Sequence, residues 1–545
     1  MIARVVGILS VLFLFCYSAV AFASSHGNSE RPNFVVIMTD NQGYGDLGAY
    51  GGLRAPTPRI DSLANEGVTF LDFQVEPNCT PSRAAFMTGR MPIRSGTSGL
   101  VFPGEPGGLH PKEVTIAEIM KSVGYDTAYY GKWHLGETPE REPQMQGFDE
   151  FYGILNTSFP IDPGFPGMDL DVIESQKVLK GAAGKPAEVA REMDLAYRPF
   201  IDRDLSEMGA KFIKEKSATK TPFFLLVSYI NPHHPVVAHP DFVGQSGGGA
   251  YPDALMEIDH NTGRVLDAVD KAGIRDNTVF LFFSDNGPTR YSLTPDENGD
   301  SGPWSGELGS AWEGGLRTIG VMRWPGKIRD NWKTAEMVHL MDFFPTFSNI
   351  VGGELPTDRP IDGIDQTDFF LGRQENSARD SRAVIFNGKL TAMRWRQFKL
   401  HFMEYERRDS LARPSYEGAS IPSLYNLRSD PKELFNVIGQ SGGTNVAAHI
   451  LKMAGFTVGT TSTDGVYIDG RLTVSGDMTG PTAAQIVLRD PSVDAAVMET
   501  ARGGLLRSIR GARGGLARDA CRRARRAAAR PGPGRLAGEP ARPPD

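Results

Sequence analysis

Near its N-terminus the chain reads Phe34–Asn41 (FVVIMTDN), a run of apolar residues that ends in an aspartate and an asparagine. A short apolar run without polar alternation is typical of a strand that is buried on both faces of a sheet. A second run, Val279–Asn286 (VFLFFSDN), has the same character and the same ending. Between them, Thr115–Val123 has the apolar spacing of a helix that begins with a capping box, and Thr127–Tyr130 predicts a further strand. This strand, helix, strand order predicts an α/β domain with a mostly parallel central sheet.

The two Asp-Asn endings predict a ligand site. In open α/β sheets, ligands bind beyond the carboxyl ends of the strands. Asp40 and Asn41 would meet Asp285 and Asn286 there, and such an oxygen-rich set suits a hard divalent cation, Ca²⁺ or Mg²⁺. The alternative for each pair taken alone is an ordinary turn.

The length, composition and net charge of the chain limit the number of domains and the kinds of partner to expect. A chain of 545 residues exceeds a single ordinary core, so two or more domains are expected. The 40% hydrophobic and 23% charged residues are ordinary for a soluble globular protein. A net charge of −7 argues against nucleic acid as the main partner.

The first 23 residues have the pattern of a signal peptide. The apolar run Val5–Phe15 follows a charged residue and leads to the small-residue cleavage pattern Ala21–Ala23. The alternative is a membrane anchor, because the whole apolar stretch is nearly long enough to span a bilayer. We favour cleavage, which predicts an exported protein, periplasmic or secreted, without a stable membrane anchor. Only Cys79 and Cys521 would then remain, too few for a disulfide scaffold.

The segment Cys79–Arg83 (CTPSR) resembles the C-x-P-x-R signature of the formylglycine-dependent, arylsulfatase-like sulfatases. Six further stretches follow the order of that family, and together they are a specific signal. They are Asp40–Leu47, Pro58–Ala64, Gly131–Gly136, Asn231–Pro235, Ser284–Gly287 and Trp312–Arg317. The resemblance covers about residues 32–437. It implies an alkaline-phosphatase-like fold with a catalytic domain over 32–375 and a smaller C-terminal α+β subdomain over 376–440.

The resemblance also implies a mechanism. A formylglycine-generating enzyme would oxidise Cys79 to an aldehyde, and one hydroxyl of the hydrated aldehyde would attack the sulfur of a sulfate ester. The other hydroxyl would then expel sulfate. Arg83 would steady the hydrated aldehyde, and Lys132 would hold the sulfate as a point charge. His134 would activate the nucleophile, and His233 would donate to the leaving group.

For the metal, the resemblance implies a Ca²⁺ or possibly Mg²⁺ site made by five residues. These are Asp40, Asn41, Asp285 and Asn286, with the modified Cys79 as a further oxygen ligand. The expected substrate is an aryl or carbohydrate sulfate ester, with specificity carried by the loops at residues 158–191 and 292–305.

Two positions depart from the family's common pattern. Asn41 stands where many members have a second aspartate, which removes one negative charge from the metal site. Leu308 stands five residues before Glu313, where common members carry a sulfate-binding lysine. Because Leu308 replaces that lysine, the alternative that the protein is a phosphonate monoester or phosphodiester hydrolase of the same superfamily stays open. A non-catalytic sulfatase-like binding protein is the third possibility, if Cys79 is never oxidised.

The C-terminal part has a different character. Within the subdomain, Trp395–Leu400 predicts a strand, and Leu424–Asn436 resembles the family's characteristic ending. Residues 443–506 are similar to the ATP-dependent ligase module of cyanophycin synthetase, a Mur-ligase relative. The phosphate-binding Gly-Lys-Thr core is missing after Asn445, which argues against ATP binding.

Residues 507–545 are rich in Arg, Ala and Pro, which predicts a disordered tail. Such a tail could be a basic arm for nucleic acid or membrane. We instead interpret everything after about residue 441 as a fused fragment without independent function.

Overall fold

The computed structural model describes residues 31–157, 176–289, 297–405, 416–438 and 443–499. The expected signal peptide and the Arg-rich tail lie outside these ranges, as do parts of the two expected specificity loops. Among the described helices, none is both long and apolar enough to cross a membrane.

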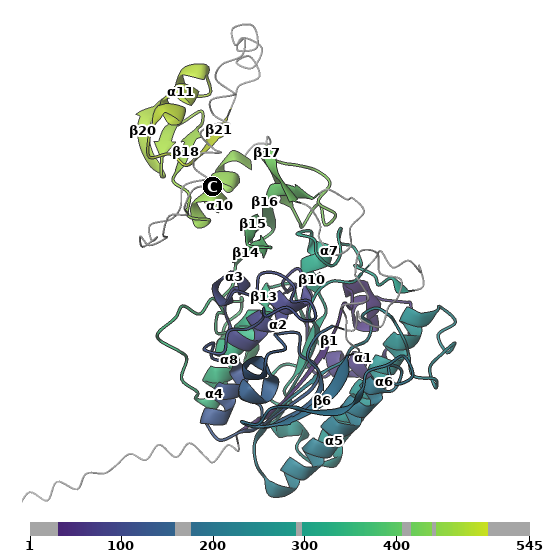
Figure 1. The fold of residues 1–545 in the computed structure, drawn as a ribbon. Helices are drawn as coiled ribbons and strands as arrows, with labels where there is room; N and C mark the ends of the chain where they lie inside the picture. Colours follow the sequence, from purple (N-terminus) through teal and green to yellow (C-terminus); the bar gives the residue numbers. More distant parts are fainter. Residues whose placement is uncertain (1–30, 158–175, 290–296, 406–415, 439–442, 500–545) are drawn as a thin grey trace, which may run out of the picture. The chain divides into compact units, whose positions relative to one another are not determined.

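A ten-stranded mixed sheet forms the catalytic domain (Figure 1), with the strand order β12-β2-β11-β9-β1-β8-β4-β5-β6-β7. Its five central strands, from β9 to β5, run parallel, while the pairs that β11, β6 and β7 make are antiparallel. The predicted mostly parallel sheet is therefore confirmed. The strands are β1 (Asn33–Thr39), β2 (Val68–Phe70), β4 (Asp126–Lys132), β5 (Glu150–Ile154), β6 (Lys177–Ala182), β7 (Glu188–Glu192), β8 (Phe223–Ser228), β9 (Thr278–Ser284), β11 (Gly320–Arg323) and β12 (Trp332–Thr334).

Strand β1 shows why its apolar run is continuous. Phe34, Val36 and Met38 belong to one hydrophobic core, while Val35 and Ile37 belong to the core on the opposite face. Helices cover both faces, so no side chain of the strand meets water.

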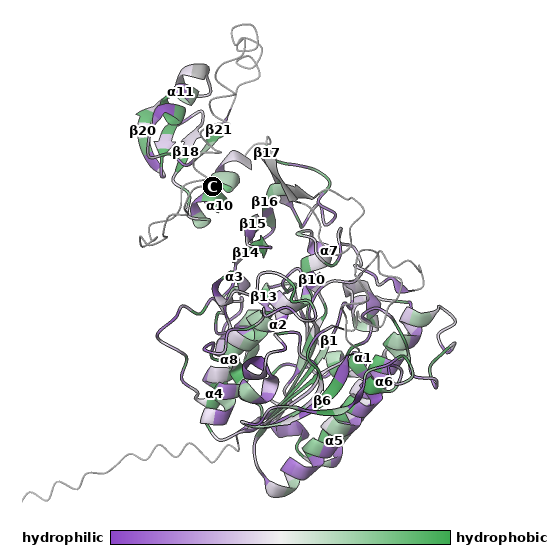
Figure 2. Cartoon of the chain, viewed as in Figure 1, coloured by the Kyte–Doolittle hydropathy of each residue, from purple (hydrophilic) through white to green (hydrophobic). Residues whose placement is uncertain are grey.

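The helices divide between these two cores. Helices α2 (Cys79–Thr88), α4 (Ile116–Ser122) and α8 (Phe343–Val351) pack on one face, and α1 (Pro58–Asn65), α5 (Ile201–Thr219) and α6 (Ala250–Lys271) on the other. Helices α5 and α6 carry both hydrophobic and hydrophilic residues (Figure 2), as expected for helices with one buried side. The predicted capping box between Thr115 and Glu118 is present at the start of α4.

The register of the central strands positions the site. Strand β1 pairs in parallel with β9, with Thr39 opposite Ser284. The next residues, Asp40 and Asp285, therefore leave the sheet side by side, and the N–H of Asp285 donates to the carbonyl of Thr39 at 3.1 Å. The predicted meeting of the two Asp-Asn endings is thus confirmed.

The chain before residue 381 also contains a small sheet and three short α-helices. The small sheet has the order β10-β3-β13, made by β3 (Phe73–Gln74), β10 (Arg317–Thr318) and β13 (Val338–His339). The short helices are α3 (Pro92–Ser95), α7 (Glu313–Leu316) and α9 (Thr367–Phe370).

The C-terminal subdomain contains an antiparallel sheet of β14 (Ser381–Phe386), β15 (Lys389–Trp395), β16 (Phe398–Tyr405) and β17 (Tyr416–Asn426). The prediction of one strand over Trp395–Leu400 was wrong. Trp395 ends β15 and Phe398 begins β16, and Arg396 between them has a φ of +52°. The turn has no Gly or Asn to mark it, and its one sequence signal is the polar pair Arg396 and Gln397, which interrupts the alternation of apolar and polar residues.

Residues 443–499 continue the chain beyond the C-terminal sheet. They contain α10 (Gly443–Met453), β18 (Val458–Thr461), β19 (Gly465–Ile468), β20 (Arg471–Ser475), α11 (Pro481–Arg489) and β21 (Ala495–Met498). Their sheet has the order β20-β19-β18-β21, with β18 and β21 parallel. Ile450 and Leu451 of α10 are buried in one cluster with Leu400 and Leu424 of the preceding sheet.

Candidate functional site

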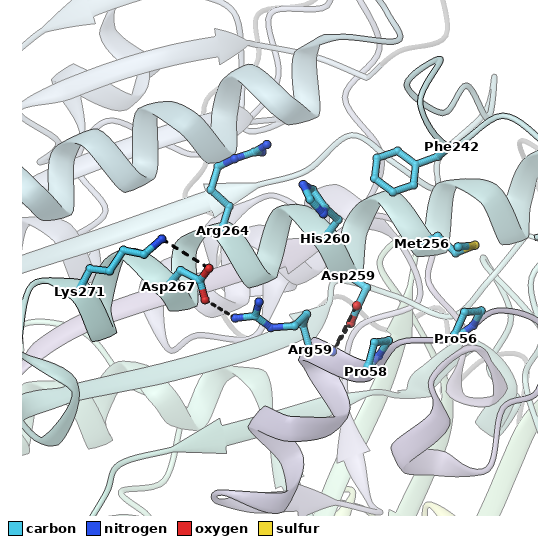
Figure 3. A pocket seen from close by; sticks show the side chains of 10 residues that line it. All are labelled: Pro56, Pro58, Arg59, Phe242, Met256, Asp259, His260, Arg264, Asp267 and Lys271. Atoms are coloured by element: carbon cyan, nitrogen blue, oxygen red, sulfur yellow. Dashed lines mark hydrogen bonds and ion pairs between the residues drawn. The ribbon is translucent and has the colours of Figure 1, made fainter. Parts of the chain in front are cut away.

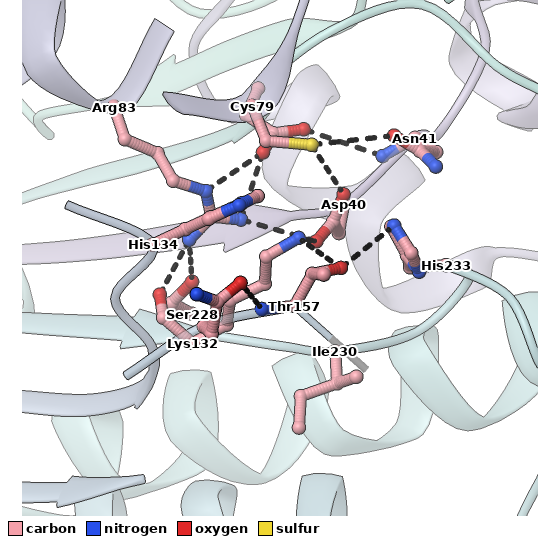
Figure 4. A network of polar contacts seen from close by, with 12 residues as sticks. Asp40, Asn41, Cys79, Arg83, Lys132, His134, Thr157, Ser228, Ile230 and His233 are labelled. Atoms are coloured by element: carbon pink, nitrogen blue, oxygen red, sulfur yellow. Dashed lines mark hydrogen bonds and ion pairs between the residues drawn. The ribbon is translucent and has the colours of Figure 1, made fainter. Parts of the chain in front are cut away.

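Cys79 is the first residue of α2, and its side chain is buried at the carboxyl end of the central sheet. Its Sγ lies 3.4 Å from Oδ1 of Asp40 and 3.9 Å from Oδ1 of Asn41 (Figure 4). Burial, and then the Asp40 carboxylate, raise the pKa of the thiol well above its ordinary value. An unmodified Cys79 in this structure is therefore a thiol and not a thiolate.

The other residues of the CTPSR segment hold this position. Thr80 donates its hydroxyl to the carbonyl of His134 at 3.1 Å. The hydroxyl of Ser82 accepts from the N–H of Glu76 at 2.9 Å and so closes the loop that precedes the helix. Pro81 is tolerated because the first turn of a helix does not need its N–H.

Two buried cations balance the two carboxylates of the site. Arg83 donates Nε to Oδ2 of Asp285 at 2.9 Å and lies 3.4 Å from Oδ2 of Asp40. Lys132 forms a direct ion pair with Asp40. Burial by itself would raise the pKa of Asp40, but the cations beside it, Lys132 first and then Arg83, hold that pKa well below its ordinary value. Burial and the neighbouring Asp40 raise the pKa of Asp285 to about 6.

The oxygen atoms of the two Asp-Asn pairs fit a divalent cation. Nδ2 of Asn286 donates to Oδ1 of Asn41 at 2.6 Å, whereas Oδ1 of Asn286 is buried without a hydrogen-bond partner among the described residues. A buried acceptor without a partner is costly, and a hard cation would satisfy it. Ligand atoms of Asp40, Cys79 and His233 also lie within 4.8 Å of one another. Asn41 has a φ of +64°, a strained conformation of the kind that clusters at functional sites.

His134 presents a free lone pair. Its Nε2 lies 3.0 Å from the carbonyl of Val101, which can only accept, so Nε2 carries the proton. Burial and Lys132 lower the pKa of His134 well below its ordinary value, so the ring is neutral. Nδ1 is then an acceptor, and it has no partner within the described part of the chain.

His233 is held as the other tautomer. Its Nδ1 donates to the carbonyl of His234 at 2.7 Å, and Nε2 accepts from the hydroxyl of Thr157 at 3.1 Å. Burial and Lys132 lower its pKa to about 3. The adjacent His234 makes a separate contact, with Nδ1 2.8 Å from a carboxylate oxygen of Glu297.

The structure thus brings the predicted catalytic and metal-ligating residues together (Figure 4), and all of them except His134 are linked by contacts of their side chains; the ring of His134 is bonded to the carbonyl of Val101. Sequence reasoning missed Thr157, whose hydroxyl lies 3.4 Å from Nζ of Lys132 and also contacts His233. It also missed Ser228, which accepts from Arg83 at 2.8 Å. Ser228 ends a central strand, and that position could have suggested it. Thr157 lies in a loop without any motif.

A buried charged cluster supports the loop that carries His233, and this too was missed. Arg198 donates to Oδ1 of Asn231 at 2.8 Å, and Asp202 accepts from the backbone N–H of Ile230 and of Asn231. Burial and the neighbouring Asp202 raise the pKa of Glu257 to about 8. Charged side chains at these distant positions carry no pattern that sequence inspection could use.

Leu308 lies in a loop that contacts both the segment after Asn286 and the segment before Cys79. Its N–H donates to the carbonyl of Pro288 at 3.0 Å, and the N–H of Gly309 donates to the carbonyl of Pro77 at 2.8 Å. Leu308 is half-buried and supplies no charge. Glu313, five residues later, is buried and binds Lys399 instead of the site.

A separate hollow of about 520 Å³ lies between α1 and α6, away from these residues (Figure 3). Its charged side chains pair mainly with one another: Asp267 binds Arg59 and lies 3.7 Å from Lys271. Asp259 accepts from the backbone N–H of Arg59 and Ile60 at the start of α1. These contacts join the two helices.

Known proteins share this architecture. The sulfatase family profile matches residues 32–353, and the profile of the N-sulphoglucosamine sulphohydrolase C-terminal family matches residues 310–454. Steryl-sulfatase of Rattus norvegicus is 35% identical over 433 residues, which cover 67% of this chain and 74% of that protein. Arylsulfatase A of Homo sapiens is 32% identical over 455 residues, which cover 78% and 86%.

Among solved structures, the PsFucS1 sulfatase from Pseudoalteromonas sp. matches with a TM-score of 0.72 and 32% identity, over 79% of this chain and 92% of that chain. The alkaline-phosphatase-like fold expected from the resemblance is confirmed. The chain belongs to the sulfatase family and is a hydrolase of sulfuric esters.

Proposed function

We propose that a formylglycine-generating enzyme converts Cys79 to formylglycine and that the hydrated aldehyde is the nucleophile toward the sulfate ester. The observation that carries the proposal is the convergence of Cys79 with Asp40, Asn41 and the cations around them. The hydrated aldehyde supplies two hydroxyls, one to attack sulfur and one to expel sulfate, so that no water has to attack sulfur. Molecular oxygen is the oxidant that this modification requires.

The side chains around position 79 take complementary roles in this proposal. Arg83 holds the hydrated aldehyde, and Lys132 binds the sulfate, since both are buried cations. The free Nδ1 of His134 accepts a proton from the nucleophile. His233 is neutral in the resting site, so it takes up a proton when the anionic substrate binds and then donates to the leaving group.

We propose that Asp40, Asn41, Asp285 and Asn286, with the modified Cys79, hold Ca²⁺ or, as the alternative, Mg²⁺. The partnerless Oδ1 of Asn286 supports this, and each carboxylate oxygen that is already hydrogen-bonded keeps a second lone pair. When bound, the cation withdraws charge from the sulfate oxygens and from the nucleophile oxygen. In the metal-free site Arg83 and Lys132 already balance the two carboxylates. The charge of the cation is thus available to an anionic substrate.

Removing the metal should reduce both activity and stability. A chelator is expected to abolish turnover, and added Ca²⁺ should restore it. At a Ca²⁺ concentration about 100 times the dissociation constant, linkage should raise the free energy of unfolding by about 2.7 kcal/mol. Thermal unfolding with and without Ca²⁺, repeated with Mg²⁺, measures this. Full activity after exhaustive chelation, with an unchanged unfolding temperature, would exclude the proposed metal site.

The nucleophile is tested by the mass of the tryptic peptide Ile60–Arg83. Protein made together with a formylglycine-generating enzyme should yield the peptide mass of an aldehyde at position 79. Protein made without that enzyme is the control and should yield the thiol. A thiol in both samples, from active protein, would contradict the mechanism.

The substrate of the proposed reaction is an aryl or carbohydrate sulfate ester. Leu308 keeps a phosphonate monoester or phosphodiester substrate as the alternative, because the usual lysine would have added a charge for sulfate. Once the aldehyde has been established, rates on an aryl sulfate and on the matching aryl phosphodiester discriminate between the two.

We further propose that residues 1–23 are a signal peptide and that the mature enzyme is periplasmic or secreted. The sequence pattern supports this. N-terminal sequencing of protein exported by a bacterial host tests it, and an N-terminus that starts at Met1 would contradict it.

For the C-terminus, we propose that residues 443–506 are a truncated Mur-ligase-like fragment without independent function. The missing Gly-Lys-Thr core supports this, although the match to the sulfohydrolase family extends to residue 454. Leu400 and Leu424 are buried together with Ile450 and Leu451 of α10.

Two truncations therefore test the fragment. Residues 24–454 should be soluble and as active as the full chain. Residues 24–440 should retain activity but be less stable. Without α10, apolar side chains of the C-terminal sheet become exposed to water, which costs about 25 cal/mol of folding free energy per Å². Specific activity and thermal unfolding of both are measured. Loss of activity in residues 24–454 would show that the later residues have a function.

A further inference from the structure

The loop of residues 305–313 bridges two of the segments that carry the proposed catalytic centre, the one before Cys79 and the one after Asn286. In its middle, Leu308 donates to Pro288 and Gly309 donates to Pro77, at 3.0 and 2.8 Å. Pro288 lies two residues after Asn286, and Pro77 lies two residues before Cys79. The position of this loop therefore affects the spacing between the nucleophile and the proposed metal ligand.

A turn of the C-terminal subdomain holds both ends of the 305–313 loop. The hydroxyl of Ser305 donates to the carbonyl of Lys432 at 2.8 Å. The N–H of Glu313 donates to Oε1 of Glu433, also at 2.8 Å. The base of the loop is closed by the N–H of Gly314, which donates to the carbonyl of Ser305 at 2.6 Å.

The turn that makes these contacts, Asp430–Glu433, is itself well defined. The carboxylate of Asp430 accepts from the N–H of Leu434 and of Phe435, both at 2.8 Å. These two hydrogen bonds fix the backbone of the turn, and the turn also contacts Ser305 and Glu313 of the catalytic domain. The turn belongs to the sequence ending that resembles the family but has no place in the proposed mechanism.

Glu433 connects this turn to the C-terminal sheet. Its carboxylate is buried and lies 3.3 Å from Nζ of Lys399 and 2.7 Å from Nε2 of His401, both on β16. Lys399 also binds Glu313 at 2.9 Å. Apolar side chains can often replace such a buried ionic group without loss of stability. Stability alone therefore does not explain why the charges are here.

We infer that Glu433 is a positioning residue for the sulfatase reaction. Through Glu433, the C-terminal sheet sets the place of the 305–313 loop, and through that loop the spacing of Cys79 and Asn286. The inference rests on the proposed function, because it assigns the nucleophile and the metal ligand to those two residues. It gives the C-terminal subdomain a role in turnover although, among its described residues, no side chain is bonded to a residue of the site's network.

The test compares Glu433→Gln with Lys432→Gln, in full-length protein that carries the modified Cys79. Lys432 is the matched control, since its side chain is exposed and only its backbone carbonyl contacts the loop. For Glu433→Gln, kcat on an aryl sulfate and the affinity for Ca²⁺ are each expected to fall about 10- to 100-fold, as for other residues that orient metal ligands. KM should change less. The control should match the parent in all three.

Hydrogen exchange in the 305–313 loop supplies a readout that needs neither turnover nor metal. In Glu433→Gln, the amides of Leu308, Gly309 and Glu313 should exchange faster, while those of β1 remain protected. Ser305→Ala removes the second tie at a half-exposed position and should shift the same amides by less. An inactive parent enzyme would count against the proposed function only, because the exchange comparison could still be made.

Two outcomes would overturn the inference. One is unchanged kcat and unchanged loop exchange in both Glu433→Gln and Ser305→Ala. The other is an equal rise of exchange in β1 and in the loop, which would assign Glu433 to general stability.

Discussion

Replacing Cys79 should abolish turnover, and the serine and alanine variants should fail in different ways. Without the aldehyde, kcat on an aryl sulfate is expected to fall by about 10⁴-fold or more in both variants, as when other covalent nucleophiles are removed. Cys79→Ser keeps one hydroxyl beside Asp40 and Asn41, so it can attack sulfur, but it has no second hydroxyl to expel sulfate. It should therefore retain about one sulfuryl group per chain. Cys79→Ala should retain none.

Intact mass after incubation with substrate, together with kcat, makes this comparison. The two variants control for each other, because both lack the aldehyde and only Cys79→Ser has a hydroxyl at position 79. Thermal unfolding should show that both remain folded, since the change in side-chain volume is small. Turnover by Cys79→Ala at a rate near that of the parent would place the nucleophile elsewhere.

Replacing Arg83 should have the largest effect on stability. Arg83 is 1% exposed and neutralises two carboxylates that are fully buried, Asp285 and Asp40. Removing one partner from a buried ion pair leaves an uncompensated charge and costs about 3–5 kcal/mol. Arg83→Met keeps most of the side-chain volume, so the charge and its hydrogen bonds are the main loss. The free energy of unfolding should fall by that amount in metal-free protein.

Chemical denaturation of metal-free protein measures this loss, with Arg94→Met as the control. Arg94 forms an exposed ion pair with Asp362 at 2.9 Å, and exposed pairs contribute about 0–1 kcal/mol. Added Ca²⁺ should recover part of the stability of Arg83→Met, because a cation would neutralise the same carboxylates. An equal, small effect of both substitutions would mean that Asp40 and Asp285 are not charged together in the folded protein.

Much of the site could be predicted from sequence because its residues lie next to strong local signals. Asp40 and Asp285 each follow an apolar strand, and the carboxyl ends of parallel strands share one edge of a sheet. Cys79 lies within a five-residue segment in which each neighbour has a chemical reason to be present. Such signals are short-range, so they survive in a linear sequence.

The sequence alone determined the α/β class, the two buried strands that run to the site, and the chemical types of the residues that meet there. Only the tertiary structure decided which buried hydrogen-bond acceptors lack a partner among the described residues, including Nδ1 of His134 and Oδ1 of Asn286. It also decided that Thr157 and Glu433 matter, because both act through partners far away in the sequence. It divided Trp395–Leu400 into a hairpin through the positive φ of Arg396. The physical reason is common to these cases: burial, register and hydrogen-bond completion depend on long-range packing, which no local pattern of residues contains.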